Sequence, residues 1–467
     1  MRRAINFARA LAFGLLVQAC ETPAPTGPAG PVKAEPVKAE PAPVQPKEAC
    51  PSWAGLEVDK LPPLPASPYA ATFDQVWRTV LIKHFDPTIG CQDWPARRAE
   101  FADKLAAAKD ATSAYAVMND LLATLKQSHF KVVPPGGATE TTSAGPARVP
   151  IHVRMIDGAA VVVDAAVGGM KSGVPQGAIL EAIDDKPVAE IAANIKNAAA
   201  GDDAAFQTMW AIESALHGQD GAKRELTLLD ARSKKLTREA TCVLPAGDLV
   251  TIGNLHDIPT TVEHRIIKGT TVGYLAFNYW MLPMVQRVER AMAELRGQGM
   301  TGLVIDLRGN PGGVGAMSIP VARMVLTEPG SLGKLQFREF AQEFNVAGNP
   351  DAFTGPVIVL VDEGTASTSE IFAAGLRDLG RVQIYGSRTS AGAALPSLIE
   401  RLEGGGMLQY VVGDYHSSKG TVAEGEGVRL DVVVPERRED FVAGRDVVLE
   451  AAVSALSKGG AAAKVQP

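Results

Sequence analysis

Cysteine, histidine and excess basic charge are all scarce in this sequence, and each shortage excludes a class of function. The 467 residues include four cysteines and seven histidines, and the formal net charge is −6. The cysteines lack metal-ligand spacing and the histidines are scattered, so we predict neither a metal site nor a cofactor. Without a basic excess, nucleic acid is not an expected partner. A chain with 46% hydrophobic and 21% charged residues is otherwise of ordinary globular composition, long enough for two or three domains.

The N-terminal apolar run is too short to cross a bilayer. Two arginines precede this run, which ends in Ala19 and Cys20, as is typical of a secretory signal. Residues 1–20 resemble a bacterial lipoprotein signal peptide, whose Cys is lipidated after cleavage, although Gln18 departs from the pattern. The alternative is a plain signal peptide cut nearby. We therefore expect a protein of the bacterial cell envelope that is attached to the membrane through lipid on Cys20 and faces the periplasm.

The next segment, residues 21–50, is rich in proline and repeats the pentad P-V-K-A-E, so it contains little that could bury a core. We predict that it is an extended tether and that residues 458–467 are a flexible tail. Once Cys20 is lipidated, three cysteines remain. An oxidising compartment permits a bridge between Cys50 and Cys91, and the odd count leaves one thiol free.

The rest of the chain divides into three regions with different residue patterns. Residues 51–135 are predicted to be helical, because apolar residues recur at helical spacing, and the last helix should end near Lys126. Residues 145–247 alternate short strands with one or two helices, including a hairpin turned by Asp157 and Gly158. From 250 to 457, apolar strands alternate with helices at 285–297, 315–327 and 368–379, which predicts an α/β layered domain.

The β-rich segment resembles a PDZ domain in the stretch Q-G-A-I-L-E-A-I-D-D-K-P-V. Ala178 and Asp185 depart from that family's pattern. The alternative is a small β-rich insert without a ligand groove.

Two strand-to-helix turns in the α/β part contain small and hydroxyl residues. In T-G-L-V-I-D-L-R-G-N-P-G-G, Gly312 and Gly313 allow backbone N–H groups to point outward, as in a site that stabilises an oxyanion. In V-D-E-G-T-A-S-T-S-E-I, Ser367 and Glu370 have the spacing of a helix capping box. If Ser367 begins the helix, the N–H of Thr368 lies near any oxyanion formed there.

These motifs, in this order, together with E-G-E-G-V-R-L-D at 424–431, resemble the C-terminal processing peptidase and tricorn-like family of serine peptidases. The resemblance covers roughly residues 70 to 455. It implies a layered ββα-spiral (crotonase-like) peptidase core beside the N-terminal helical domain and the PDZ-like domain. It also implies that Ser367 is the nucleophile and Ser369 is structural.

The family has two branches that differ in the catalytic base. The processing branch uses a lysine in T-F-G-K-G, but the matching stretch here is T-S-A-G-A, with Gly392 at the lysine position. The other branch, which includes tricorn and interphotoreceptor retinoid-binding-like proteins, uses a histidine. L-L-A-T-L-K-Q-S-H resembles its N-terminal motif, which implies His129 as the base assisted by Ser128, although the usual acidic residue before the His is absent.

A histidine base needs a partner that orients its ring and stabilises the imidazolium. The resemblance assigns this role to Glu424, and Glu426 is the rival. The hydroxyl of Ser367 would then attack a peptide carbonyl, and N–H groups of Gly312 or Gly313 and of Thr368 would hold the oxyanion. The expected function is an envelope-anchored serine endopeptidase or C-terminal processing peptidase, acting on peptides or proteins.

Two other functions fit parts of the sequence. The same fold could be a catalytically inactive binder of peptides or hydrophobic ligands, which the missing acidic residue before His129 favours. A crotonase-type acyl-CoA enzyme would use the same oxyanion turn, but the tether and the envelope signal argue against it.

Overall fold

A computed structural model describes residues 50–135, 145–167, 170–198, 203–252, 255–420 and 422–458. The predicted signal peptide, the tether up to residue 49 and the tail from residue 459 lie outside the described residues. Within these ranges, no helix is both long enough and apolar enough to cross a bilayer.

The predicted helical region contains three α-helices. They are α1 (Ala70–Lys83), α2 (Trp94–Ala106) and α3 (Ala111–Ala123), preceded by a short 3₁₀ turn, η1 (Val58–Lys60). Asp93 and Asp110 begin α2 and α3 by accepting backbone N–H groups with their side chains, which satisfies donors that a helix start leaves free. Helix α3 ends at Ala123, close to the predicted end near Lys126.

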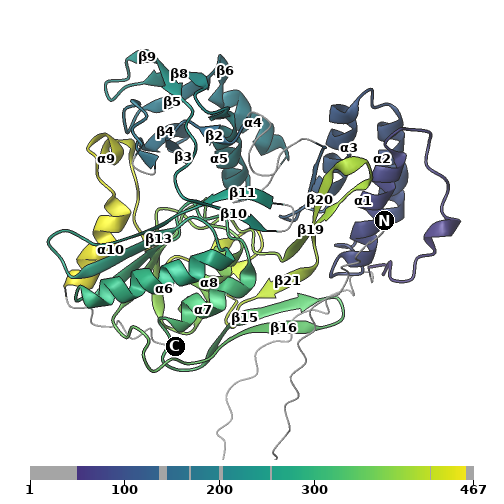
Figure 1. Cartoon of the computed structure of the whole chain (residues 1–467). Coiled ribbons are helices and arrows are strands. Elements are labelled where there is room, and N and C mark those ends of the chain that lie inside the picture. The colour runs from purple at the N-terminus through teal and green to yellow at the C-terminus, as the bar shows by residue number, and fades with distance from the viewer. Residues whose placement is uncertain are drawn as a thin grey trace, which may run out of the picture. The chain divides into compact units, whose positions relative to one another are not determined.

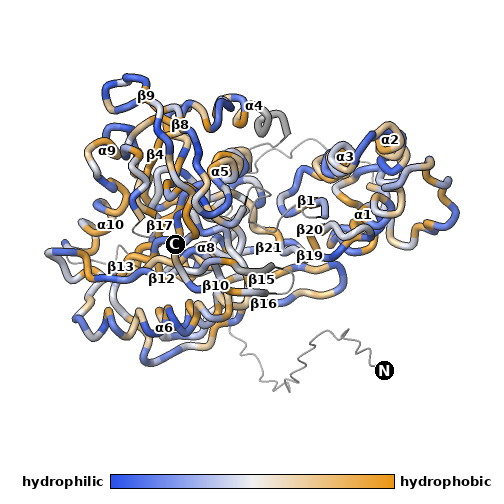
Figure 2. The backbone as a smooth tube through the Cα atoms, turned by 45° about the horizontal axis from the view of Figure 1, so that its top comes forward, coloured by the Kyte–Doolittle hydropathy of each residue, from blue (hydrophilic) through white to orange (hydrophobic). Residues whose placement is uncertain are grey.

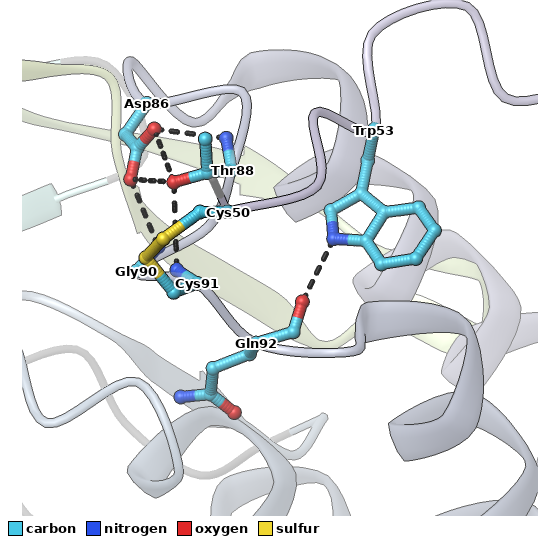
Figure 3. Close-up of a disulfide and its surroundings, with 7 residues drawn as sticks. All are labelled: Cys50, Trp53, Asp86, Thr88, Gly90, Cys91 and Gln92. Carbon is cyan, nitrogen blue, oxygen red and sulfur yellow. Dashed lines mark hydrogen bonds between the residues drawn. A yellow bond between two sulfur atoms is a disulfide. The ribbon is translucent and has the colours of Figure 1, made fainter. Parts of the chain in front are cut away.

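A disulfide joins Cys50 to Cys91, so the bridge that the cysteine count permitted is formed, and Cys242 is a buried free thiol. Figure 3 shows how the bridge closes a loop in which the Asp86 carboxylate accepts hydrogen bonds from Thr88 and Gly90. The indole of Trp53 donates to the carbonyl of Gln92 on the other side of the bridge (2.7 Å). The start of the folded part is therefore attached to the loop between α1 and α2.

Cys91→Ser is expected to lower the free energy of unfolding by about 2–4 kcal/mol, because the bridge closes a long loop in the unfolded chain. The two cysteines are 41 residues apart in sequence. Thermal or urea unfolding of the oxidised protein and the variant measures the difference. Equal stability of the two under oxidising conditions would contradict the expectation.

The segment from 145 to 247 forms a sheet with the strand order β3-β4-β5-β8-β9, to which β6 adds at β5. The turn at Asp157 and Gly158 joins β3 and β4 as an antiparallel hairpin, as predicted. Helices α4 and α5 belong to the same segment, in which the short strands β2 and β7 also pair. The elements are β2 (Ala147–Arg148), β3 (His152–Ile156), β4 (Ala159–Asp164), β5 (Ile179–Ile183), β6 (Lys186–Pro187), α4 (Val188–Ala198), α5 (Asp203–Ala215), β7 (His217–Gly218), β8 (Lys223–Leu229) and β9 (Lys235–Thr241).

The α/β part contains a six-stranded sheet with the order β12-β13-β14-β17-β18-β24, in which all neighbouring pairs except β12 with β13 are parallel. Apolar strands were predicted in this part of the chain, and this sheet contains them. The sheet strands are β12 (Val262–Ile266), β13 (Val272–Phe277), β14 (Gly302–Asp306), β17 (Val357–Leu360), β18 (Val382–Gly386) and β24 (Val432–Val433).

Alternate residues of these strands face opposite sides, and both faces are covered. One face packs on α10 (Val447–Ser457) and the other on α6 (Leu282–Gly297), α7 (Ser318–Arg323) and α8 (Thr368–Asp378) (Figure 1). In Figure 2, hydrophobic and hydrophilic colours alternate along α6, as expected for a helix with one buried side. The chain therefore has the α/β layered core that was predicted.

Smaller elements complete this part. They are β10 (Asp248–Ile252), β11 (Leu255–Thr260), η3 (Gly315–Met317), β15 (Gly330–Phe337), β16 (Ala341–Val346), β19 (Ser397–Arg401), η4 (Glu403–Gly405), β20 (Met407–Val411), β21 (Gly413–His416), β22 (Val422–Ala423), β23 (Gly427–Val428) and α9 (Arg438–Val442). The helix predicted at 315–327 is shorter, because 3₁₀ turn η3 supplies its start and α7 ends at Arg323.

One hairpin of the α/β part packs on the N-terminal helices. Strand β20 pairs with β19 on one side and on the other with β1 (Lys131–Val133), which begins just after His129 (Figure 2). Leu402, Leu408 and Tyr410 share a buried cluster with residues of α1, α2 and α3. This pairing connects the segment that contains His129 with the part of the chain that contains Ser367.

Candidate active site

Ser367 stands at the turn between β17 and α8, and it is the one partly exposed residue between Val357 and Leu376. Its backbone has φ 55° and ψ −118°, a conformation that residues with a side chain rarely adopt. Such strain persists only where surrounding contacts enforce it, and it concentrates at functional sites. The turn therefore presents one strained serine side chain at the surface of an otherwise buried segment.

Glu370 holds this turn in place. Its carboxylate accepts the N–H of Ser367 (2.9 Å), as the capping-box spacing predicts, and also the hydroxyl of Ser390 (2.6 Å). The N–H groups of Gly392 and Ala393 donate to the same carboxylate at 2.9 and 3.0 Å. Burial raises the pKa of Glu370 above its ordinary value, although these hydrogen-bond donors oppose the shift. Glu370 thus fixes the start of α8 against the segment 390–393.

The glycine-rich turn after β14 lies directly beside Ser367. Buried Asn310 accepts the N–H of Ala366 with its carbonyl (3.0 Å), and its amide side chain donates to the carbonyl of Phe277 (2.8 Å). The hydroxyl of Ser369 donates to the same Asn310 carbonyl (3.1 Å) and accepts the indole N–H of Trp280 (2.8 Å). Ser369 is fully buried, so its hydroxyl supports the structure of this turn.

Two backbone N–H groups next to Ser367 are available to an oxyanion. Among the described residues, neither Gly313 N–H nor Thr368 N–H donates an intramolecular hydrogen bond. The hydroxyl of Thr368 donates to the carbonyl of Gly313 (2.9 Å), which holds the two residues together. By contrast, Gly312 N–H donates to the side chain of Asn310 (3.0 Å). Of the two glycines predicted as alternatives, Gly313 is the one whose donor is free.

Gly312 serves the site through the space that it leaves. A Cβ atom at this position, where φ is +101°, would lie 2.8 Å from Ser367 Cβ and 3.0 Å from Thr368 N. Atoms at that separation clash, and one of them belongs to a candidate oxyanion donor. Only glycine keeps this space open.

Gly312→Ala is expected to lower kcat by about 100-fold or more, the usual effect of losing one oxyanion donor. Gly309→Ala is the matched control, because its φ is +68° but its added Cβ would meet no atom within 4 Å. Both variants place a side chain at a positive φ, so the difference in kcat between them reports on the space beside Ser367. Equal activity of the two variants would contradict the expectation.

His129 is connected to Glu424 through Ser128. The hydroxyl of Ser128 is hydrogen-bonded to His129 Nδ1 (2.7 Å), and Ser128 N–H donates to Glu424 Oε1 (2.6 Å). Burial lowers the pKa of His129 to about 4 and raises the pKa of Glu424 to about 7. The imidazole is therefore neutral at pH 7, as a general base must be. Glu426 is exposed, and its carbonyl accepts from Thr389 (3.2 Å).

Ala393 and Ala394 link the two halves of the candidate site. Ser367 N–H donates to the carbonyl of Ala393 (2.9 Å), and Ala394 N–H donates to Glu424 Oε2 (3.2 Å). Ser367, Glu424, Ser128 and His129 therefore belong to one continuous set of contacts. No hydrogen bond joins Ser367 directly to His129 in the part of the chain that the structure describes.

Gly392, at the lysine position of the processing branch, has no room for a side chain. Its φ is +68°, and an added Cβ would lie 2.8 Å from the backbone of Gly425 and 2.9 Å from that of Glu426. A lysine here would require the segment containing Glu424 to move. The described residues also contain no group of three or more His, Cys, Asp and Glu side chains able to hold a metal ion.

The sequence did not reveal a buried ion network near the turn that contains Ser367. Arg154 of β3 donates to Glu363 at 3.1 and 2.8 Å and to Glu436 at 2.8 Å, and it lies 3.5 Å from Asp362. Asp362 in turn accepts the N–H groups of Gly309 and Gly364. An arginine between apolar strand residues gave no signal in the sequence, because its partners come from distant segments.

Comparison with known proteins finds similarity to peptidases. Residues 271–434 match the family model described as Peptidase family S41. The chain is 26% identical over 403 residues to a carboxyl-terminal-processing protease of Synechocystis sp., covering 83% of this chain and 87% of that protein. It is also 26% identical over 379 residues to the chloroplastic carboxyl-terminal-processing peptidase 2 of Arabidopsis thaliana, covering 78% and 68% of the two chains.

Solved structures show the same fold. The photosystem II D1 C-terminal processing protease aligns with a TM-score of 0.56 at 23% identity, covering 85% of this chain and 99% of that one. Mature CPAF aligns with a TM-score of 0.59 at 14% identity, covering 84% and 98%. The predicted resemblance to C-terminal processing peptidases is confirmed, and so is the α/β peptidase fold.

Proposed function

Starting from a serine-type peptidase with a family S41 domain, we propose that Ser367 is its nucleophile and His129 its general base. Ser128 and Glu424 orient the imidazole, and the N–H groups of Gly313 and Thr368 form the oxyanion site. The observation that supports this most directly is the hydrogen-bonded chain from Glu424 through Ser128 to His129 Nδ1. Ser128 and Glu424 are 296 residues apart in sequence, so folding alone brings them together.

In the proposed mechanism, Ser367 Oγ attacks the carbonyl carbon of a peptide while His129 Nε2 takes its proton, since Nδ1 is already bonded to Ser128. The negative charge that develops on the carbonyl oxygen is held by Gly313 and Thr368 N–H. His129 then gives the proton to the leaving amine, and water hydrolyses the acyl-enzyme by the same path in reverse. Catalytic hydrogen bonds are often loose in an enzyme without substrate, so Ser367 and His129 are expected to approach on binding.

The relatives named as processing proteases raise the question of a lysine base. Two observations favour a histidine base in this chain. Gly392 leaves no room for a side chain, and the Ser128 hydroxyl is hydrogen-bonded to His129. Covalent labelling with a fluorophosphonate, followed by peptide mapping, tests the proposal. The adduct is expected on Ser367, and failure of the folded protein to react would overturn the nucleophile assignment.

A pH profile tests the role of Glu424. Because its pKa is raised to about 7 and that of His129 is lowered to about 4, kcat/KM should fall as the pH drops below about 7 while His129 is still neutral. Glu424→Gln should lower kcat/KM and remove this limb, leaving one near pH 4. A limb near pH 7 that survives in Glu424→Gln would contradict the assignment.

The same carboxyl has the opposite effect on stability. Its folded-state pKa is above the ordinary value of 4.5, so the folded state favours the protonated form. The contribution of Glu424 to stability is thus present at low pH and is lost as the pH rises through about 7. Comparing the unfolding of wild type and Glu424→Gln at pH 5 and pH 8 measures this contribution separately from activity.

For the cellular setting, we propose an envelope protein that faces the periplasm and is anchored through Cys20, acting on peptides or on the C-termini of proteins. The signal-like N-terminus supports this, and the names of the cyanobacterial and chloroplast relatives support processing of C-termini. Mass spectrometry of the mature N-terminus tests the anchor. A lipid-modified Cys20 is expected, and an unmodified N-terminus elsewhere would contradict it.

A further inference from the structure

The turn that contains Ser128 and His129 has an unusual backbone. Lys126 has φ 54° and His129 has φ 60°, so two residues other than glycine adopt left-handed conformations within four positions. Each such residue is strained and needs neighbouring contacts to hold it. The orientation of His129 therefore depends on what contacts this turn on either side.

His84 contacts the turn on both sides of the Ser128–His129 pair. It directly follows α1 and its side chain is fully buried. Its Nε2 is 2.8 Å from Gln127 Oε1, next to Ser128. Its ring stacks on Phe130, next to His129, with 5.9 Å between ring centroids and 14° between planes.

His84 is itself held from two directions. Nε2 is hydrogen-bonded to Gln127, and Nδ1 lies 3.1 Å from the backbone nitrogen and 3.0 Å from the carbonyl oxygen of Asp86. Asp86 belongs to the loop closed by the disulfide, where its carboxylate is bonded to Thr88 and Gly90 (Figure 3). From the other direction, Arg338, between β15 and β16, donates to the carbonyl of His84 (2.8 Å). His84 is thus held by its ring within the helical region and by its backbone carbonyl to the α/β part.

We propose that His84 is a positioning residue for catalysis: it fixes residues 126–130 so that Ser128 meets His129 Nδ1 and His129 Nε2 is directed toward Ser367. This inference rests on the proposed role of His129 as the general base. The common alternative for a buried histidine is that it only fills the core. A core residue would affect stability, whereas a positioning residue affects the reactivity of Ser367 in the folded enzyme.

His84→Phe separates these roles, because it keeps a ring for stacking on Phe130 and removes the hydrogen bond to Gln127. We expect the folded variant to lose about 10- to 100-fold in kcat and in its rate of fluorophosphonate labelling, since small displacements of a catalytic group have effects of this size. KM for a peptide should stay within about twofold, because substrate-binding contacts are unchanged. Gln127→Leu should reproduce the loss, and the double variant should lose no more than either single one.

His264→Phe is the matched control. His264 is bonded to Glu294 on the α/β part (2.7 Å), and the His264→Phe variant should be labelled at the wild-type rate. If folded His84→Phe and Gln127→Leu both label at the wild-type rate while His129→Ala does not label, the inference is overturned and the proposed function stands. If His129→Ala itself labels normally, the proposed function fails instead. Should His84→Phe not fold, a wild-type rate for Gln127→Leu would still overturn the inference.

Discussion

Ser367→Ala is expected to abolish acyl-enzyme formation and to lower kcat by about 10⁵- to 10⁶-fold, the scale seen when one member of a catalytic unit is removed. The loss is complete for labelling because no other hydroxyl occupies the same place. Ser367 is the partly exposed residue of a buried segment, and it stands beside the free N–H groups of Gly313 and Thr368. Intact-mass analysis after fluorophosphonate treatment measures labelling, and a peptide assay measures kcat.

The same substitution should leave the fold nearly as stable as the wild type. Glu370 bonds the backbone N–H of residue 367 rather than its side chain, so alanine keeps that contact. The unfolding free energy should therefore change by less than ~1 kcal/mol, the usual cost of losing a capping side chain. Circular dichroism and thermal unfolding confirm that the inactive variant is folded.

Ser369→Ala is the matched control, two residues away. It removes a buried hydroxyl that bonds both Asn310 and Trp280, so we expect a loss of about 1–3 kcal/mol in stability. The folded fraction should still be labelled on Ser367. Labelling that persists in Ser367→Ala but disappears in Ser369→Ala would show that the nucleophile had been assigned to the wrong serine.

Local patterns were enough to predict the elements that position Ser367. The apolar runs that precede the two small-residue turns form β14 and β17. The helix predicted at 368–379 is α8, Thr368–Asp378. These succeed because a buried parallel strand followed by a small-residue turn is determined by residues close in sequence. The capping relation between Ser367 and Glu370 is similarly local, and its Glu370 half is present.

Contacts between distant segments could not be predicted in the same way. The choice between Gly312 and Gly313 depends on Asn310, whose side chain takes one N–H only in the folded turn. The burial of Arg154 depends on Glu363 and Glu436, which are 209 and 282 residues away. The sequence contains each residue, but only packing determines which groups remain free.

His129→Ala is expected to lower kcat/KM nearly as much as Ser367→Ala, by about 10⁴- to 10⁶-fold, because the nucleophile is inactive without its base. The effect should be smaller than additive in the double variant with Ser367→Ala, since the two residues act as a unit. Labelling by a fluorophosphonate should slow by a similar factor, because that reaction also requires removal of the Ser367 proton. Rates of labelling and of peptide cleavage, measured on the same folded preparations, test this.

The magnitude distinguishes histidine from the alternatives. A lysine acting as base would leave the rate of His129→Ala close to that of wild type, and the crowded backbone around Gly392 offers no place for one. If His129 only supported the fold, its loss would lower stability and leave the reactivity of the folded fraction unchanged. Ser128→Ala provides the intermediate case. It removes the hydroxyl between Glu424 and His129 Nδ1 but keeps the N–H donated to the carboxylate. Its kcat should therefore fall by less than that of His129→Ala and by about as much as that of Glu424→Gln, because both changes weaken the same chain of hydrogen bonds.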